Sequence, residues 1–157
     1  MYPSDLAPTV AAYIAGMIDG EGSVGAFVDK NHPDGRHVAI YIRVYNADAG
    51  ALQWMQTETG IGAVKVARKG TETHRTSWVW DIGGGFRIAW LLGQTTSYMH
   101  IKVPQAQLML TLCGMRRGNT RYNSNLTEQE IIVGQFNILN ARGPRPGDSL
   151  MQDLRFA

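Results

Sequence analysis

The sequence has little cysteine, little net charge and no long apolar run. A single cysteine, Cys113, among 157 residues excludes an internal disulfide and a cysteine-based zinc site. The formal net charge of +2 does not by itself indicate a nucleic-acid partner. No apolar stretch approaches the roughly 18 residues of a membrane span, and no charged-then-apolar leader opens the chain. We therefore expect a soluble, intracellular protein that is not secreted and has no membrane partner.

The composition is typical of one globular domain. Hydrophobic residues make up 44% of the chain and charged residues 18%, which is enough apolar material for a sizeable core. The glycine- and proline-rich segment at 143–147 cannot continue a helix. We expect a single domain over residues 1–142, followed by a C-terminal tail over 143–157.

Apolar periodicity and turn residues predict an alternation of helices and strands. Asp48 is a predicted helix N-cap, and Thr127 with Glu130 forms a capping-box pattern. The predicted helices cover 9–19, 48–58, 86–92, 103–116 and 127–140, and the predicted strands cover 23–29, 37–46, 63–68 and 75–82. This order predicts an α+β fold, with an antiparallel sheet covered by helices on one face.

Side-chain alternation predicts which strand residues face the core. Strand 37–46 shows the clearest pattern, with an apolar face on one side and a polar face on the other. The pattern in the last strand is less regular, since both of its faces carry bulky apolar residues. The residues expected to face inward are Val24, Ala26, Val28, Val38, Ile40, Ile42, Val44, Val64, Val66, Trp78, Trp80 and Ile82; Trp54 and Trp90 are also expected in the core.

The segment 13–23 is the most informative part of the chain. Ala12, Gly16 and Gly20 are spaced four residues apart, so they line one stripe of a helix with almost no side chain. A second helix can approach such a stripe closely. The Gly20-Glu21-Gly22 step is expected to break the helix and to leave backbone carbonyls beside a carboxylate, which are oxygen ligands suited to Mg²⁺.

The residues of 14–22, Ile-Ala-Gly-Met-Ile-Asp-Gly-Glu-Gly, resemble the LAGLIDADG motif of a family of homing endonucleases. The resemblance implies that Glu21 is the metal-binding acid and that the carbonyl of Gly20 joins it. The implied cofactor is Mg²⁺, or another divalent cation such as Mn²⁺ or Ca²⁺ at the same site. The order of predicted elements also matches the αββαββα core of the family, whose sheet forms a DNA-binding saddle.

Two further positions resemble catalytic positions of the family. Lys102 lies in a segment similar to the one that carries a catalytic-pocket lysine, and an ammonium there would stabilise negative charge at a phosphate. The alternative is an exposed basic residue before a helix. Asn46 matches a position that orients the hydrolytic water, and an amide would act by orientation because it has no useful pKa. It has an equally good interpretation as a strand-ending turn residue.

A chain with one motif supplies half of a paired site. We therefore expect a homodimer with a two-fold axis through the motif helices and a near-palindromic double-stranded DNA target. Asp19 is expected to cap or orient the end of its helix, near the interface. The residues expected at the interface are Ala12, Ala15, Gly16, Asp19 and Gly20.

The outward strand faces are the expected DNA-binding surface, because a β-ribbon fits the major groove. Individually, each of these residues can equally belong to an ordinary solvated strand face. Arg43, Lys65 and Arg75 are expected on guanine edges or phosphates, and Tyr41 and His37 on bases or bridging water. Arg68 and Lys69 are expected on backbone phosphate. Candidates with a weaker basis are Phe27, Asp29, Asn31, Arg36 and Ser77.

Taken together, the residues and the resemblance predict a Mg²⁺-dependent homing endonuclease that cuts both strands of a long target. The resemblance implies 3′ overhangs, a role in the mobility of an intron or a free-standing gene, and a bacterial, phage or organellar location. No small-molecule substrate is expected. The alternatives are a cleavage-deficient relative, such as an intron-splicing maturase or a DNA-binding regulator, and a dimeric α+β protein with no nucleic-acid role.

Overall fold

The computed structural model describes residues 4–33, 35–117 and 125–141, so the expected tail at 143–157 lies outside the described residues. The α+β class and the order of elements are as predicted. The elements are α1 (Pro8–Glu21), β1 (Gly22–Asp29), β2 (His37–Asn46), α2 (Ala49–Thr59), β3 (Ala63–Arg68), β4 (Ser77–Ile82), α3 (Gly85–Thr95), the 3-10 turn η1 (Thr96–Tyr98), α4 (Val103–Arg117) and α5 (Leu126–Leu139).

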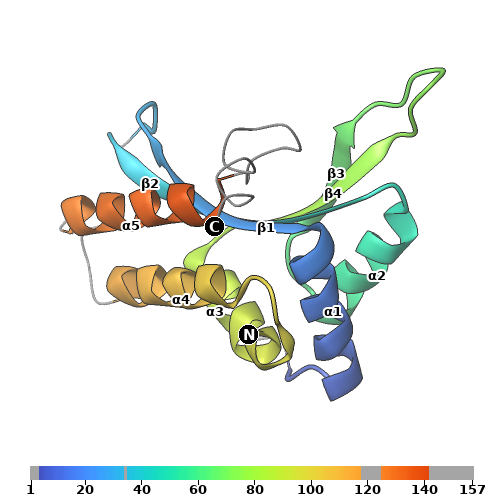
Figure 1. Cartoon of the computed structure of the whole chain (residues 1–157), viewed down its shortest axis with the longest axis horizontal. Helices are drawn as coiled ribbons and strands as arrows, with labels where there is room; N and C mark the ends of the chain where they lie inside the picture. The colour runs from blue at the N-terminus through green and yellow to red at the C-terminus, as the bar shows by residue number, and fades with distance from the viewer. Residues whose placement is uncertain (1–3, 34, 118–124, 142–157) are drawn as a thin grey trace, which may run out of the picture.

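The four strands form one antiparallel sheet in the order β1-β2-β4-β3. Figure 1 shows the two hairpins, β1–β2 and β3–β4, rising at opposite ends of the sheet, so that its open face is concave. The helices lie beneath the other face, with α1 and α2 under one end and α3, α4 and α5 under the other. The predicted saddle with helices on one side is therefore confirmed.

The core lies between the sheet and the helices. Val38, Ile40, Ile42 and Val44 of β2 are all buried, as their alternation predicts. Trp80 of β4 is completely buried, and its indole N–H donates to the carbonyl of Ile61 at 2.9 Å. This hydrogen bond holds the segment that leads into β3 against the core. In that segment Gly62 adopts a positive φ of 76°. The core therefore anchors the hairpin that rises at one end of the saddle.

Several predicted boundaries are wrong, each for a local reason. Helix α1 does not break at Gly20 but continues through Glu21, because Gly22 forms the cap and donates its N–H to the carbonyl of Ile18. Strand β4 begins at Ser77 and not at Arg75, after an irregularity in the pairing of β3 with β4. The capping box of α5 is also absent: the helix begins at Leu126, and Glu130 instead pairs with Arg36 at 2.7 Å.

Two apolar side chains expected in the core are exposed. Val66 lies near the end of the edge strand β3, beyond the helices, and is 43% exposed. Trp54 lies on the outer side of α2 and is 39% exposed. Helix α2 buries Leu52 and Met55 and so leaves Trp54 on another side, which the sequence pattern does not reveal. In the described part of the chain, no helix is long and apolar enough to cross a membrane.

Candidate functional site

The motif helix α1 ends in an exposed carboxylate at the edge of the sheet. Glu21 is the last residue of the helix and is exposed, as is Gly20 before it. A Cβ on Gly22 would lie 2.5 Å from the carbonyl oxygen of Ile18, so the chain can turn directly from helix into strand only with glycine there. This tight junction fixes Glu21 beside the first residue pair of the β1–β2 ladder, Gly22 with Val44.

Asp19 ties the end of α1 to the start of α4. Its carboxylate is 8% exposed and accepts the backbone N–H groups of His100 at 2.6 Å, Ile101 at 3.2 Å and Lys102 at 2.9 Å. Asp19 was expected to cap or orient the end of its own helix. It instead binds and orients the segment before α4. The ammonium of Lys102 in turn donates to the backbone carbonyl of Asp19.

The hydrogen bonds at Asp19 determine its protonation state. Burial alone would raise the pKa of this carboxyl, but the backbone N–H groups of His100, Lys102 and Ile101 and the charge of Lys102 together lower the pKa below its ordinary value of 3.8. Asp19 is therefore ionised at neutral pH and remains an acceptor for the segment that carries Lys102.

Asn46 is the last residue of β2, two residues beyond Val44, which pairs with Gly22 at the end of α1. Its side-chain oxygen accepts the N–H of Asp48 at 2.9 Å, which is the turn-forming role. Asn46 also lines an open hollow of about 580 Å³ together with Arg75 and Trp78. The structure thus brings Asn46 together with one predicted DNA-binding residue, and the amide nitrogen of Asn46 is left available as a donor among the described residues.

The donors at the end of α1 fit a hard divalent cation. The last carbonyls of a helix have no partner within the helix, and Gly20 and Glu21 are the last two residues of α1. Backbone carbonyl and carboxylate oxygens are donors that such a cation accepts. In the described ranges of the chain, no three histidine, cysteine, aspartate or glutamate side chains gather around a common point. Glu21 therefore belongs to no cluster of three or more such side chains within the described chain.

The outward stripe of α1 is open. Ala12, Gly16 and Gly20 are exposed, and a Cβ on either glycine would meet no atom within 4 Å. The prediction for Ala15 is corrected, since this residue is 0% exposed within its own chain and has no surface left for a partner. Asp19 likewise faces inward, toward the segment before α4.

An exposed aromatic pair flanks this stripe. Tyr13 of α1 is 46% exposed and meets Trp54 of α2 edge to face, with the ring centroids 5.2 Å apart. With Ala51, the pair lines a shallow hollow of about 320 Å³. The open surface of α1 therefore continues onto α2.

The open face of the sheet carries a charged cluster at its centre, which we call the Asp81 cluster and define as Arg43, Lys65 and Asp81. Nε of Arg43 donates to one carboxylate oxygen of Asp81 at 3.1 Å, and Nζ of Lys65 lies 2.5 Å from the other. The guanidinium of Arg43 also lies 4.4 Å from the centroid of the Tyr41 ring. Sequence reasoning predicted the two cations and Tyr41 but missed Asp81.

The strand pairing explains why Asp81 was missed. Asp81 of β4 pairs directly with Arg43 of β2. Lys65 of β3 pairs with Val79, two residues before Asp81, so it reaches Asp81 along a diagonal. Alternate residues of a strand share a face, so the outward position of Asp81 follows from that expected for Ser77, four residues earlier in β4. The order β1-β2-β4-β3, which places β4 between both cations, was the missing information.

Other predicted DNA-binding residues differ in accessibility. His37 is only 8% exposed because the ring of His32 covers it, with the centroids 3.9 Å apart. Arg36 is held by Glu130 of α5, and Asp29 accepts the N–H of Asn31 in the β1–β2 turn. Burial leaves His37 little surface for DNA, whereas the Arg36 side chain is 54% exposed and its DNA contact stays a prediction. The exposed or half-exposed candidates among these are Phe27, Asp29, Asn31, Arg36, Arg68, Lys69, Arg75 and Ser77.

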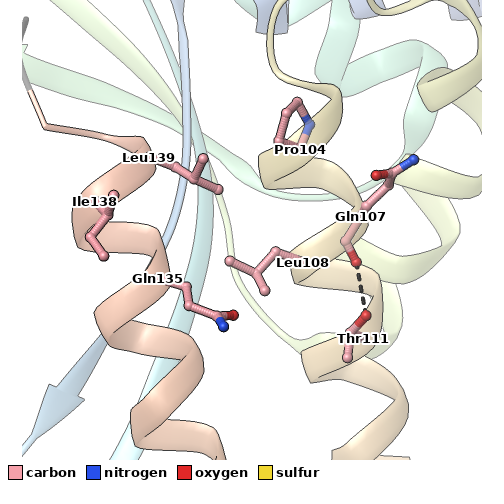
Figure 2. Close-up of a pocket in the computed structure, with 7 residues that line it drawn as sticks. All are labelled: Pro104, Gln107, Leu108, Thr111, Gln135, Ile138 and Leu139. Atoms are coloured by element: carbon pink, nitrogen blue, oxygen red, sulfur yellow. Dashed lines mark hydrogen bonds between the residues drawn. The ribbon is translucent and has the colours of Figure 1, made fainter.

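An apolar groove lies elsewhere, between α4 and α5. It has a volume of about 510 Å³, and Figure 2 shows Leu108 of α4 and Leu139 of α5 pointing into it from opposite sides. None of the predicted site residues lines this groove. It is separate from both the end of α1 and the open face of the sheet.

Comparison with solved structures identifies the fold. The homing endonuclease I-CvuI, in complex with its target in the presence of Ca, matches 88% of this chain over 87% of its own, with a TM-score of 0.72 and 20% identity. The archaeal intron-encoded homing endonuclease I-Vdi141I, complexed with DNA, matches 94% of the chain over 97% of its own, with a TM-score of 0.69 and 16% identity.

I-SmaMI, bound to an uncleaved DNA target in the presence of calcium, matches 90% of the chain over only 52% of its own length, with a TM-score of 0.64 and 18% identity. No family model and no curated protein matches the sequence. The chain therefore has the fold of the LAGLIDADG homing endonucleases, which confirms the expected fold.

Proposed function

We propose that this protein is a homing endonuclease that, as a homodimer, cleaves both strands of a near-palindromic DNA target. The observation that carries the proposal is the junction at the end of α1. There an exposed Glu21 follows Gly20 on a helix whose end is joined by Asp19 to the segment that bears Lys102. This junction lies at the edge of a concave sheet face with accessible cations (Figure 1).

Each residue has a role that its chemistry allows. Glu21 and the carbonyl of Gly20 hold Mg²⁺, or Mn²⁺ or Ca²⁺ in its place. When bound, the cation stabilises negative charge on the attacking and leaving oxygens of a phosphodiester. Lys102 contributes a second positive charge toward the phosphate, and its backbone is fixed by Asp19. Asn46 orients the attacking water through its amide nitrogen and transfers no proton.

The homodimer follows from the number of ligands per chain. One protomer presents one Glu21, and the open stripe of Ala12, Gly16 and Gly20 lets a second copy of α1 approach. Two carboxylates brought together repel each other unless divalent cations neutralise them. The match to about half of the I-SmaMI chain is consistent with a unit that must be doubled. A two-fold dimer would read a palindromic or nearly palindromic target.

The further details rest on the likeness to homing endonucleases. We propose 3′ overhangs and a role in the mobility of an intron or a free-standing gene, in a bacterial or phage cytoplasm or an organelle. Two structures of I-CvuI with DNA were obtained in the presence of Mg and of Ca, which supports the use of a divalent cation here.

The proposal is tested with DNA selected by the protein itself. Duplexes that bind in Ca²⁺ are enriched from a randomised pool, and the enriched sequence is placed in a plasmid. We expect Mg²⁺ to make the wild-type protein linearise this plasmid. We expect Glu21→Gln to bind the duplex with unchanged affinity and to lower the cleavage rate at least about 100-fold, because one cation ligand is lost.

Glu58→Gln on α2 is the matched control, since this exposed carboxylate lies away from the junction and its loss should leave cleavage unchanged. Selective binding without any nicking by the wild-type protein would contradict the endonuclease and favour a cleavage-deficient relative, such as a maturase or a regulator. Failure to enrich any sequence, with only weakly salt-dependent binding, would contradict a nucleic-acid role altogether.

A further inference from the structure

The Asp81 cluster places one carboxylate between two cations at the centre of the surface that faces DNA in the proposed function. Asp81 lies on β4, between Arg43 of β2 and Lys65 of β3, and its side chain is 19% exposed. Each of its two carboxylate oxygens is occupied by one cation, at 3.1 Å for Arg43 and 2.5 Å for Lys65. Three charged side chains from three strands therefore form one unit.

Asp81 positions the guanidinium of Arg43 and leaves part of it available to bind another group. Among the described residues, Asp81 engages only Nε of the guanidinium, so both terminal amino groups remain free to donate. The guanidinium is also held 4.4 Å from the centroid of Tyr41. Two contacts on different sides fix the plane of the group, and a fixed guanidinium with two parallel donors matches O6 and N7 of guanine.

The position of Tyr41 is itself determined by its neighbours. Gly25 of β1 pairs with Tyr41, and a Cβ at Gly25 would lie 2.5 Å from the phenol oxygen. The Tyr41 ring therefore crosses the bare backbone of β1, with Phe27 6.3 Å away between ring centroids. The support beneath Arg43 thus depends on a glycine in the neighbouring strand.

Asp81 also changes the balance between selective and unselective binding. Arg43 and Lys65 without Asp81 would present two positive charges, which attract any phosphate backbone. With Asp81 ionised, the three residues carry a net charge of +1. The carboxylate remains ionised at neutral pH because Lys65 and Arg43, by hydrogen bonds and by charge, lower its pKa despite the opposing effect of burial.

We propose that Asp81 is a specificity-determining residue, which holds Arg43 in position to read a guanine edge in each half-site and suppresses phosphate binding by Arg43 and Lys65. This inference rests on the proposed DNA-binding function and goes beyond it, by assigning a role to a carboxylate that touches no catalytic residue. Its direct consequence is that one guanine position in each half of the target depends on Asp81.

The test compares wild type and Asp81→Asn by enrichment from a randomised duplex pool in Ca²⁺. We expect the wild-type protein to enrich a motif with a guanine in each half-site. We expect Asp81→Asn to relax that position about 10-fold, which is within the range of one bidentate base contact. Its binding to a duplex of unrelated sequence should become tighter and more salt-dependent, with the slope of log K against log salt steeper by about 1.

Glu58→Gln removes the same charge from the helical side and should change neither quantity. A double-mutant cycle keeps the inference testable even when Asp81→Asn is less stable. Arg43→Gln alone should remove the guanine preference. Adding Asp81→Asn to Arg43→Gln should then cause no further loss of discrimination at that position.

The outcomes separate the inference from the proposed function. Enrichment of the same motif, with equal discrimination, by wild type and Asp81→Asn overturns the role of Asp81 and leaves the endonuclease intact. An equal loss of base preference at all target positions, in both Asp81→Asn and Glu58→Gln, also overturns the role of Asp81. Enrichment of no motif by the wild-type protein overturns both.

Discussion

At the scale of single residues, the candidate site depends on carboxylates in three different environments. Glu21 is exposed at the end of α1, Asp19 is buried under three backbone N–H groups, and Asp81 lies between two cations. The surroundings therefore assign the roles: an exposed carboxylate is available to a cation, a buried one fixes the backbone, and a paired one fixes side chains. Residue type alone would not distinguish the three.

We expect Asp19→Asn to destabilise the protein by about 2 kcal/mol, because hydrogen bonds to a charged acceptor are stronger than those to an amide oxygen. The pKa of Asp19 is lowered in the folded state, so its contribution is complete above the ordinary value of 3.8 and is lost as the pH falls through the folded value.

The difference in unfolding free energy between wild type and Asp19→Asn should therefore be constant from about pH 8 to about pH 5 and should shrink below about pH 4. Urea unfolding at a series of pH values measures it. A difference that stays constant at acidic pH would contradict the assigned role of the Asp19 carboxylate.

At the scale of elements, the decisive feature is the direct junction of α1 with β1. No loop separates the two, because Gly22 both caps the helix and begins the strand. The missing Cβ is what permits this, since the space is filled by the backbone of Ile18. The position of Glu21 relative to the sheet is thus set by a single residue.

We expect Gly22→Ala to destabilise the protein by about 3 kcal/mol, since the added Cβ would lie 2.5 Å from the carbonyl oxygen and 2.7 Å from Cα of Ile18. Gly93→Ala is the control: it lies within α3, where a Cβ meets no atom within 4 Å, and should stabilise by up to about 1 kcal/mol. Urea midpoints measure both changes. Equal midpoints for Gly22→Ala and wild type would show that α1 and β1 separate easily.

At the scale of the whole molecule, the proposed DNA-binding surface is on the sheet and the proposed dimer interface is on helix α1. The concave face of the sheet carries Arg43 and Lys65. Helix α1 lies beneath the sheet beside α2 (Figure 1) and exposes its stripe of Ala12, Gly16 and Gly20. The end of α1 lies where these two surfaces meet. In the proposed dimer, a partner on the stripe would bring its own Glu21 to the same place.

We expect Gly16→Leu to separate the proposed dimer, because a large side chain would fill the stripe where the two helices approach. Overpacking of about 3 kcal/mol corresponds to a roughly 100-fold weaker dimer. The structure predicts an unchanged fold, since a Cβ on Gly16 meets nothing within its own chain.

Sedimentation velocity measures the association state, circular dichroism the fold, and plasmid linearisation the paired activity. Gly93→Leu, at an open position on α3, is the matched control and should remain dimeric. A Gly16→Leu protein that remains a dimer would place the interface elsewhere.

Much of the fold could be predicted because its signals are local. The alternation in β2 identified its buried face, and Asp48 was correctly identified as the cap of α2, where it accepts the N–H groups of Gly50 and Ala51. Both depend only on residues that are neighbours in the sequence. The motif around Glu21 is also contiguous, so the candidate ligand could be named before its surroundings were known.

The sequence by itself determined the order of the elements, the inward face of the best-patterned strand and the identity of the exposed acid. The tertiary structure alone decided that Asp19 binds a segment about 80 residues further along the chain, that Ala15 faces its own core and that Asp81 lies between two cations. Periodicity tells which side of an element is apolar, but only strand order and helix packing determine what lies opposite a given side chain.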